Sequence, residues 1–345
     1  MTKTNPLTDL IAQKGWVLAD GAIGTNLFQR GLETGYPPEL WNVERPDDVL
    51  WLHNAFLEAG SDLILTNSFG GTSYRLKLHG SENRVTELNV AAAQSARQAA
   101  DAQDRPVIVA GSMGPTGELF SPLGTLEMDA AVAAFSEQAT ALADGGADIL
   151  WIETMSSVEE VEAAVEAAKG TGLPVCATMS FDTAGRSMMG VQPEQFTQLA
   201  HQHGLTGFGA NCGIGPAELL DAVIAFSGAV KCLDGDASEA GYIIAKGNCG
   251  IPAYVDGEIH YHGSPDLMAE YAIFARDAGA RIIGGCCGTT PQHVQAMHEA
   301  LTSAKKADLD TDKLKATLGE AWSNIPEAPQ GAAAERRSSR RRRSR

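Results

Sequence analysis

The chain has 345 residues, of which 44% are hydrophobic and 20% charged, so it holds enough apolar material for a large packed core. Its formal net charge is −17, and because the last ten residues include seven arginines, the remainder carries −24. So acidic a body argues against nucleic acid as the main partner, and no run approaches the roughly 18 consecutive apolar residues of a membrane helix.

Eight short apolar runs recur along the chain, with helix-like stretches between them. In chain order they cover residues 16–20, 62–67, 106–112, 148–154, 175–181, 207–212, 242–248 and 281–287. Apolar residues at helical spacing between the first two runs predict a helix over 46–59. Eight alternating units predict a single (β/α)8 TIM barrel. An open doubly wound sheet is the alternative, but "DGAIGTN" after the first run lacks the G-x-G-x-x-G spacing.

The two ends of the chain have different characters. The first residues, MTKTNPLTDL, contain no apolar signal-peptide core, so we expect a cytoplasmic protein. We expect the barrel to occupy residues 1–303, and 304–345 to form an extension that ends in a disordered Arg-rich tail. The tail has nothing to bury, and a solubilising or self-docking role is its simplest interpretation, with contact to RNA or phosphates as the alternative.

Three segments, AGSDLILTN, GGADILWIE and AGARIIGGC, repeat one pattern. Each has a glycine that ends a helix, followed by an apolar strand. Seven residues beyond this glycine, the three copies place Asn67, Glu153 and Cys286 at the carboxyl ends of their strands. Catalytic groups of TIM barrels collect at that rim. We therefore expect the chemistry there.

Three cysteines fall at this predicted rim. Cys286 and its neighbour Cys287 follow the eighth strand among the flexible glycines 284, 285 and 288, and Cys212 ends the sixth strand. Three thiolates from two strands predict a tetrahedral zinc site with one position open to substrate. Buried free cysteines are the alternative for the adjacent pair. Cys249, in "KGNCGIP", is the competing ligand, and we rank it below Cys212 because only Cys212 ends its strand directly.

The other cysteines and the histidines do not fit a metal site. Cys176 lies in the middle of a predicted strand and Cys232 in a polar segment after the sixth helix. None of the eight histidines lies at a predicted strand end: His201 and His203 fall in or just after a helix, while residues 260 and 262 are placed in a loop. We therefore expect a cysteine-only set of ligands.

Three thiolates make a zinc centre electron-rich. Such a centre generates hydroxide poorly by comparison with histidine-rich sites, but it suits a fourth sulfur, which the metal holds as a nucleophilic thiolate. Alkyl transfer to a thiol is therefore the reaction class that the predicted site favours.

Seven motifs carry a resemblance to a known family: LADGAIGTNL, TNSF, GSMGP, DILWIETM, GANCGIGP, KGNCGIP and GGCCGTTPQH. From about Gly15 to Leu301 the chain resembles the homocysteine S-methyltransferases, and most closely the bacterial betaine–homocysteine type. The family also includes the homocysteine module of cobalamin-dependent methionine synthase. The resemblance implies a TIM barrel, zinc on Cys212, Cys286 and Cys287, and conversion of homocysteine to methionine.

The resemblance also suggests contacts to the amino-acid part of homocysteine. Glu153 resembles the family's acidic residue for the ammonium group, and Asp20 with Gly21 resembles the loop that closes over the amino acid. A plain Asp-Gly turn is the alternative for that pair. Further candidates are Ser112 as a carboxylate donor, and Thr66 and Asn67 as substrate contacts or hydrogen-bonding caps.

The methyl donor is expected to be a small onium compound, with betaine first. Aromatic faces hold quaternary ammonium groups well, and Phe69 matches the family's Phe-Tyr pair, but Gly70 stands where its Tyr would be. Tyr36 and Trp41 lie near the family's Trp, with helix packing as the alternative for Trp41 and Tyr74.

Other functions remain open at this stage. They are methyl transfer from a sulfonium donor, activation of homocysteine for a corrinoid or methylfolate partner protein, and plain zinc or homocysteine binding. The sequence is compatible with a homo-oligomer and does not specify one.

Overall fold

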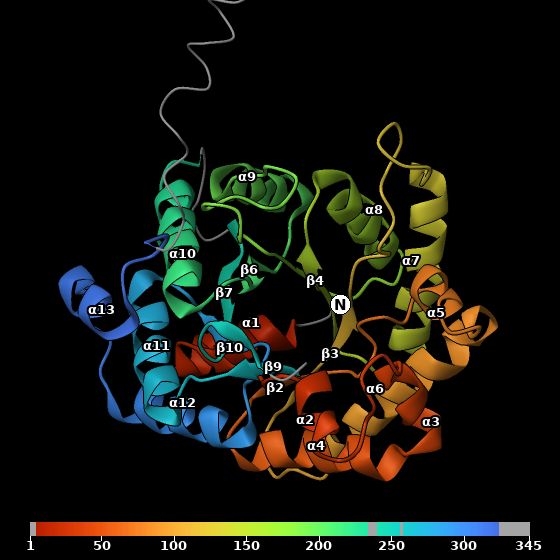
Figure 1. The fold of residues 1–345 in the computed structure, drawn as a ribbon, viewed down its shortest axis with the longest axis horizontal. Coiled ribbons are helices and arrows are strands. Elements are labelled where there is room, and N and C mark those ends of the chain that lie inside the picture. The colour runs from red at the N-terminus through yellow and green to blue at the C-terminus, as the bar shows by residue number, and fades with distance from the viewer. Residues whose placement is uncertain (1–4, 234–239, 256–257, 324–345) are drawn as a thin grey trace, which may run out of the picture.

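Eight parallel strands form one closed barrel in the computed structural model, which describes residues 5–233, 240–255 and 258–323. The sheet order is β1-β10-β7-β6-β5-β4-β3-β2, and the Asp20 amide, which bonds the Leu63 carbonyl at 3.0 Å, joins β1 to β2. Every expected run contains or overlaps one strand, so the predicted TIM barrel is confirmed (Figure 1). The strands are β1 (Val17–Leu18), β2 (Leu63–Leu65), β3 (Ile108–Met113), β4 (Ile149–Met155), β5 (Val175–Met179), β6 (Gly207–Cys212), β7 (Tyr242–Gly247) and β10 (Ile282–Gly285).

Helices surround this barrel and bury their apolar faces against the strands (Figure 1). The predicted helix over 46–59 is confirmed as α4 (Pro46–Glu58). The other long helices are α6 (Val85–Asp101), α7 (Met128–Asp144), α8 (Val158–Lys169), α9 (Pro193–His203), α10 (Pro216–Val230), α11 (Pro265–Ala278) and α12 (Pro291–Ser303). Short helical turns lie in the connections, namely α2 (Gly24–Phe28), η1 (Pro38–Leu40), α3 (Trp41–Glu44), α5 (Ser73–Lys77) and η2 (Glu82–Arg84).

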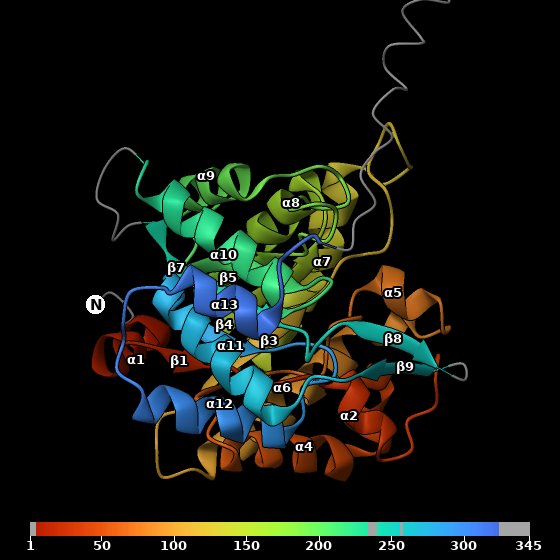
Figure 2. The ribbon, with the colours of Figure 1, turned by 60° about the vertical axis from the view of Figure 1, so that its left-hand side comes forward.

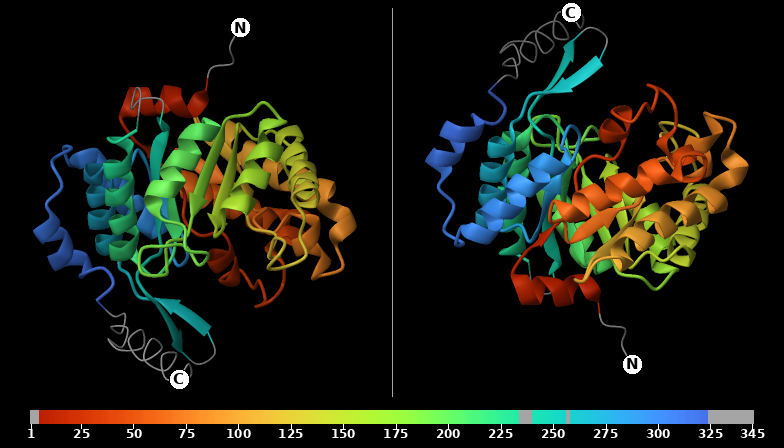
Figure 3. Two further views of the ribbon diagram at one scale, coloured as in Figure 1. Left: turned by 90° about the horizontal axis from the view of Figure 1, so that it is seen from above. Right: turned by 90° about the horizontal axis from the view of Figure 1, so that it is seen from below.

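The amino-terminal end of the barrel is covered by helix α1 (Pro6–Lys14). Leu7, Leu10 and Ile11 on this helix belong to the same buried cluster as inward-facing strand residues such as Val17 and Ile149. Figure 3 shows α1 at one end of the molecule and, at the other, the hairpin of strands β8 (Pro252–Val255) and β9 (Glu258–Tyr261). One end of the barrel is therefore closed by packing, which leaves the carboxyl ends of the strands for a site.

The repeated glycines act where helices end. Gly60, Gly146 and Gly279 have φ angles of 104°, 101° and 120°, which L side chains rarely adopt. Each lies just beyond the last turn of a helix and directs the chain into the next strand. The repeated glycine in the three segments is therefore explained by the positive φ angle that the backbone needs at this position.

A hairpin after β7 departs from the sequence expectation. Strands β8 (Pro252–Val255) and β9 (Glu258–Tyr261) pair antiparallel and extend beyond the barrel wall (Figure 2). His260 lies in β9 and not in a loop, which corrects the earlier assignment. The alternation of βα units gives no reason to expect strands outside the barrel, because an added hairpin is not part of that repeat.

The chain beyond the barrel continues as helix α13 (Thr311–Leu318), which packs Leu314 into the main apolar cluster beside α11. The predicted Arg-rich tail lies outside the described residues. Among the described helices, none combines the length and apolar character that crossing a membrane requires.

His53 on α4 gives a pH prediction for stability. The side chain is 1% exposed and neither ring nitrogen has a hydrogen-bond partner among the described residues; burial lowers its pKa from 6.5 to about 4. The unfolded chain therefore takes up a proton between pH 6.5 and 4 while the folded chain does not, so stability is lost as pH falls through this window. At pH 4.5, the wild type is expected to lose about 2–3 kcal/mol more unfolding free energy, relative to pH 7.5, than His53→Phe does. Urea unfolding at both pH values measures this difference, and equal losses would contradict it.

Candidate functional site

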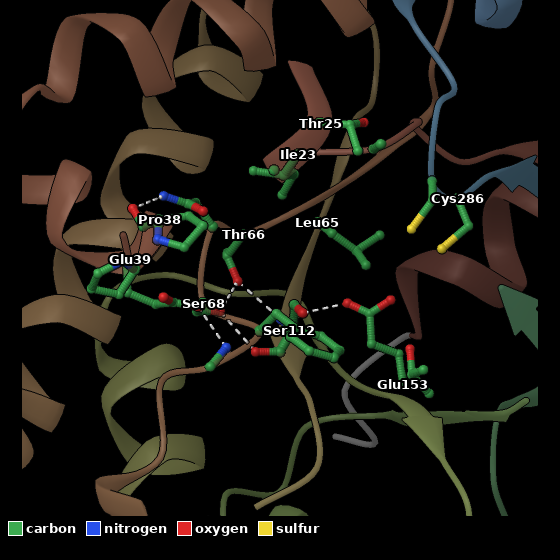
Figure 4. A pocket seen from close by; sticks show the side chains of 18 of the residues that line it. Ile23, Thr25, Pro38, Glu39, Leu65, Thr66, Ser68, Ser112, Glu153 and Cys286 are labelled. Atoms are coloured by element: carbon green, nitrogen blue, oxygen red, sulfur yellow. Dashed lines mark hydrogen bonds between the residues drawn. The ribbon is translucent and has the colours of Figure 1, made fainter. Parts of the chain in front are cut away.

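A cavity of about 580 Å³ lies at the carboxyl ends of the barrel strands (Figure 4). It brings together most of the residues that the sequence singled out. Those that line it are Gly21, Tyr36, Thr66, Asn67, Phe69, Ser112, Glu153, Cys212, Cys286 and Cys287. Asp20 and Trp41 are not among its lining residues, and their surroundings are described below.

Three sulfur atoms converge at one side of the cavity. The Sγ atoms of Cys212, Cys286 and Cys287 all lie within 4.8 Å of one another, and Cys212 and Cys287 are 3.9 Å apart. Tetrahedral zinc with Zn–S bonds of about 2.3 Å requires sulfurs separated by about 3.8 Å. The spacing of the thiols therefore fits a zinc ion.

Backbone constraints aim these sulfurs at one point. Cys212 has a φ of 60°, which is uncommon for a side-chain-bearing residue and typical of functional sites. A Cβ on Gly285 would lie 2.2 Å from Thr289, and one on Gly288 would lie 2.4 Å from Tyr261. Only glycine fits at these two places, so the loop of Cys286 and Cys287 can fold tightly against its neighbours.

Two asparagines that the sequence analysis did not single out hold the cysteine loops. Asn248 accepts a hydrogen bond from the Cys287 amide at 3.1 Å and donates to the Gly213 carbonyl at 2.7 Å. Asn211 accepts from the Thr154 amide, and its own amide group lies 3.9 Å from the Cys286 sulfur. Both belong to an Asn-Cys-Gly sequence, at 211–213 and 248–250, and this repetition was the signal that could have found them.

The three thiols are electrostatically coupled. For Cys212 and for Cys287, one hydrogen bond to another thiol of the group lowers the pKa and a second one raises it. Burial and repulsion between the sulfurs also act, and together they raise the pKa of each of these two thiols to about 12. Three negative sulfurs at this spacing repel one another unless a cation lies between them. Their chemistry therefore matches their geometry as a cation site.

The sulfurs of the remaining cysteines are not part of this group, and all six cysteines are free thiols. The sulfur of Cys249 lies 3.0 Å from the His293 Nε2 atom and 3.0 Å from the Gly263 carbonyl oxygen. Cys176 is fully buried in β5, as expected for a core residue, and Cys232 is exposed after α10. Cys249, the competitor for the metal, is therefore engaged elsewhere.

A chain of hydroxyl groups leads from β2 to the carboxylate of Glu153 (Figure 4). The Oγ atoms of Thr66 and Ser68 are 2.6 Å apart, and Thr66 accepts from the Ser112 amide at 2.9 Å. The Ser112 hydroxyl donates to Glu153 Oε1 at 2.5 Å. Burial raises the pKa of Glu153, while Lys246 and Ser112 act against that rise. Glu153 is thus a buried carboxylate at the cavity wall, which a cation would stabilise.

Lys246 on β7 is a lining residue that the sequence analysis missed. Its Nζ atom lies 2.7 Å from Oδ1 of Asp20, and the other Asp20 oxygen accepts the Leu65 amide at 2.8 Å. Asp20 is therefore fully buried behind Lys246, and its neighbour Gly21 lines the cavity in its place. A single lysine at the end of an apolar strand gave no sign that it points inward.

Aromatic side chains line another part of the cavity. Phe28, Tyr36 and Phe69 are 46%, 38% and 38% exposed, and the Tyr36 hydroxyl donates to Glu44 at 2.6 Å. A Cβ on Gly70 would lie 2.9 Å from the buried carboxylate of Glu39, which accepts the Gly70 amide. Glu39 therefore occupies the space that a side chain at position 70 would need.

Trp41 lies in the core instead. It is 4% exposed, belongs to the main apolar cluster and lies under the guanidinium group of Arg45, 4.2 Å from the ring centroid. The Trp41 ring therefore packs within the core of helices and strands, which is the alternative named for this residue. Tyr74 packs partly buried against the same cluster.

Comparison with known proteins identifies related proteins over most of the chain. Residues 17–301 match the homocysteine S-methyltransferase family. The chain is 31% identical over 320 residues to a methionine synthase of Mycobacterium tuberculosis and 30% identical over 313 residues to that of Mycobacterium leprae. These matches cover 88% and 86% of this chain but only 26% and 25% of those proteins, so the chain spans about a quarter of their length.

Solved structures give the same result. The metallated form of the homocysteine methyltransferase MmuM from Escherichia coli superposes with a TM-score of 0.70 at 25% identity, covering 86% of this chain and 99% of that one. Its oxidised form gives a TM-score of 0.68 at 26% identity, with the same coverage. With the matched residues running through the whole barrel and all three clustered cysteines, the chain belongs to the homocysteine S-methyltransferase family.

Proposed function

We propose that this protein is a zinc-dependent S-methyltransferase that converts homocysteine to methionine with a small onium donor, betaine being the first candidate. One observation carries the proposal: the three sulfurs and a group of aromatic rings line the same cavity. The sulfurs are suited to a thiol substrate and the rings to a methylated cation.

Zinc would be held by Cys212, Cys286 and Cys287, and when bound it supplies an open ligand position and deprotonation of a coordinating thiol at neutral pH. The chain itself orients the three sulfurs. The positive φ of Cys212 and the glycines on either side of Cys286 and Cys287 set their directions. Asn248 joins the two cysteine loops by bonding the Cys287 amide and the Gly213 carbonyl, and the Asn211 amide group lies 3.9 Å from the Cys286 sulfur.

Glu153 and Ser112 would orient the rest of homocysteine. The Glu153 carboxylate lies in the cavity wall on the side of Cys286 (Figure 4) and is suited to receive the ammonium group. Ser112 already donates to Glu153, so it fixes the direction of that carboxylate. Thr66 and Asn67 use their polar atoms for the Ser112 amide, the Pro38 carbonyl and Asn42, which supports a positioning role for both.

The methyl group would approach from the aromatic part of the cavity. In the transfer, the homocysteine sulfur forms a bond to the methyl carbon while the donor's bond to that carbon breaks and its electrons leave with the donor. The amine of betaine and the sulfide of a sulfonium donor then leave as neutral groups, whereas methylfolate needs a proton or a cobalamin relay. Phe28, Tyr36 and Phe69, with the Glu39 carboxylate beside Gly70, support a cationic donor.

The purified chain with homocysteine and a single added donor tests this proposal. Methionine formation from betaine or a sulfonium compound, with no other protein present, is the expected result. Turnover only after addition of a methylcorrinoid or methylfolate protein would instead make the chain the thiol-activating component of a larger system. The much greater length of the two mycobacterial methionine synthases is the observation that favours this second function.

Phe69→Ala gives a sharper prediction for the donor. Loss of one ring removes cation–π attraction of about 0.5–2 kcal/mol, so the donor KM is expected to rise about 2- to 30-fold. The homocysteine KM should change less, because in this proposal homocysteine is held by Glu153 and the metal and not by the Phe69 ring. Trp51→Ala is the matched control, since that ring is equally exposed at 38% but outside the cavity. Equal rises in both KM values would remove Phe69 from the donor site.

A further inference from the structure

Lys246 lies in a buried group of charges next to the cavity. Its side chain is 2% exposed, its partner Asp20 is 0% exposed, and their charged atoms are 2.7 Å apart. A lysine this deeply buried is rare unless it is paired. Burial by itself lowers the pKa of Lys246, but attraction to Asp20 and then to Glu153 outweighs it, so the pKa is raised overall. The ammonium group is therefore charged, with a direct bond to Asp20 and a longer-range attraction to Glu153.

The bonds of Asp20 show that this carboxylate is already satisfied. One oxygen accepts Lys246 and the other accepts the Leu65 amide. Asp20 also does not line the cavity, whereas both Lys246 and Glu153 do. A ligand in the cavity therefore reaches Glu153 directly but is separated from Asp20.

The charges do not cancel. When both carboxyl groups are ionised, Asp20, Glu153 and Lys246 together carry one net negative charge. Burial raises the pKa of both carboxyl groups, while Lys246 acts against that rise in each. Among the described residues, the only side-chain donor to Glu153 is the neutral Ser112 hydroxyl. An uncompensated carboxylate at a buried position is unfavourable, and a ligand with one positive charge removes the cost. A ligand with a single ammonium group therefore has the charge that this site needs.

We propose that Lys246 is a positioning and specificity-determining residue: held by Asp20, it leaves Glu153 as the single uncompensated carboxylate and so selects an acceptor thiol with one ammonium group. The inference rests on the proposed contact between Glu153 and that group. It predicts that Asp20, which does not line the cavity, controls ligand choice through Lys246.

The test compares homocysteine with 4-mercaptobutanoate, the same thiol without its amino group. Dissociation constants for both are measured by calorimetry on the metal-loaded protein. The wild type is expected to prefer homocysteine by about 10- to 150-fold, the range of one charge-assisted hydrogen bond, and Glu153→Gln should bring this ratio near one. No preference in the wild type, or an unchanged ratio in Glu153→Gln, would reject the proposed ammonium contact itself.

Variants of the charged pair then test the role of Lys246. Asp20→Asn frees Lys246 to neutralise Glu153, so the preference should fall to about threefold or less, as in Glu153→Gln. Lys246→Met leaves two uncompensated carboxylates, so the preference should rise at least about threefold. The double variant Asp20→Asn/Lys246→Met restores the original net charge and should return the ratio to within about threefold of wild type.

Asp62 provides a matched control at the opposite end of the barrel. It bonds Lys14 at 2.6 Å and the Leu18 amide at 3.0 Å, the same two kinds of partner that Asp20 has. Asp62→Asn is expected to leave the ligand ratio unchanged whatever its effect on thermal stability. The inference is overturned if Asp20→Asn keeps the wild-type ratio, if both single variants lower it, or if the double variant does not recover. Should one single variant fail to fold, the other and the double variant still decide, because their expected directions differ.

Discussion

The protein is expected to hold about one zinc per chain, and Cys286→Ala is expected to abolish this binding. The three sulfurs lie within 4.8 Å of one another, so removing one leaves two ligands from different strands and no tetrahedral set. Methyl transfer should be lost with the metal, since the thiol substrate would lose its activating partner. Cys212→Ala and Cys287→Ala should behave in the same way, as measured by elemental analysis of the purified proteins.

The other three cysteines are the controls for this result. Cys176→Ala and Cys232→Ala should keep full zinc content, because neither thiol belongs to the cluster. Cys249→Ala should also keep it, since that sulfur contacts His293 and the Gly263 carbonyl. Full zinc content in Cys286→Ala, or its loss in Cys249→Ala, would contradict the assignment of ligands.

Glu153→Gln is expected to weaken homocysteine binding while zinc content stays the same. A charge-assisted hydrogen bond contributes about 1.5–3 kcal/mol, which corresponds to about a 10- to 150-fold higher dissociation constant without it. Glutamine keeps the shape of the side chain and its bond to Ser112, so the change tests the charge. Calorimetric titration with homocysteine measures the effect.

Glu160→Gln is the matched control. Glu160 is also a buried glutamate with a raised pKa caused chiefly by burial, and it also accepts a hydroxyl, that of Thr116 at 2.7 Å. It does not line the cavity. Its replacement should leave homocysteine affinity unchanged, and an equal affinity in Glu153→Gln and the wild type would take Glu153 out of the substrate site.

Local sequence was enough for the barrel and for the cluster of three cysteines. Apolar runs of strand length alternate with helical patterns because each strand of a parallel barrel is buried on both sides. The carboxyl ends of parallel strands meet at one rim, so residues that end separate strands, such as Cys212 and Cys286, could be placed together without any coordinates. The glycines at 60, 146 and 279 allowed the three repeated segments to be aligned, because their positive φ angles end a helix just before the next strand begins.

Tertiary packing decided what the strand pattern leaves open. Trp41 and Tyr36 were equal candidates for the donor site, yet the rotation of the short helix α3 buries Trp41 in the core while Tyr36 lines the cavity. Lys246 and Asp20 end strands that are far apart in sequence, and only closure of the barrel brings their charges to 2.7 Å. Periodicity reports which residues are buried, but the partner of a buried charge depends on distances across the barrel. That is why the cysteines could be read from the sequence, and the charged pair beside them became visible only in the fold.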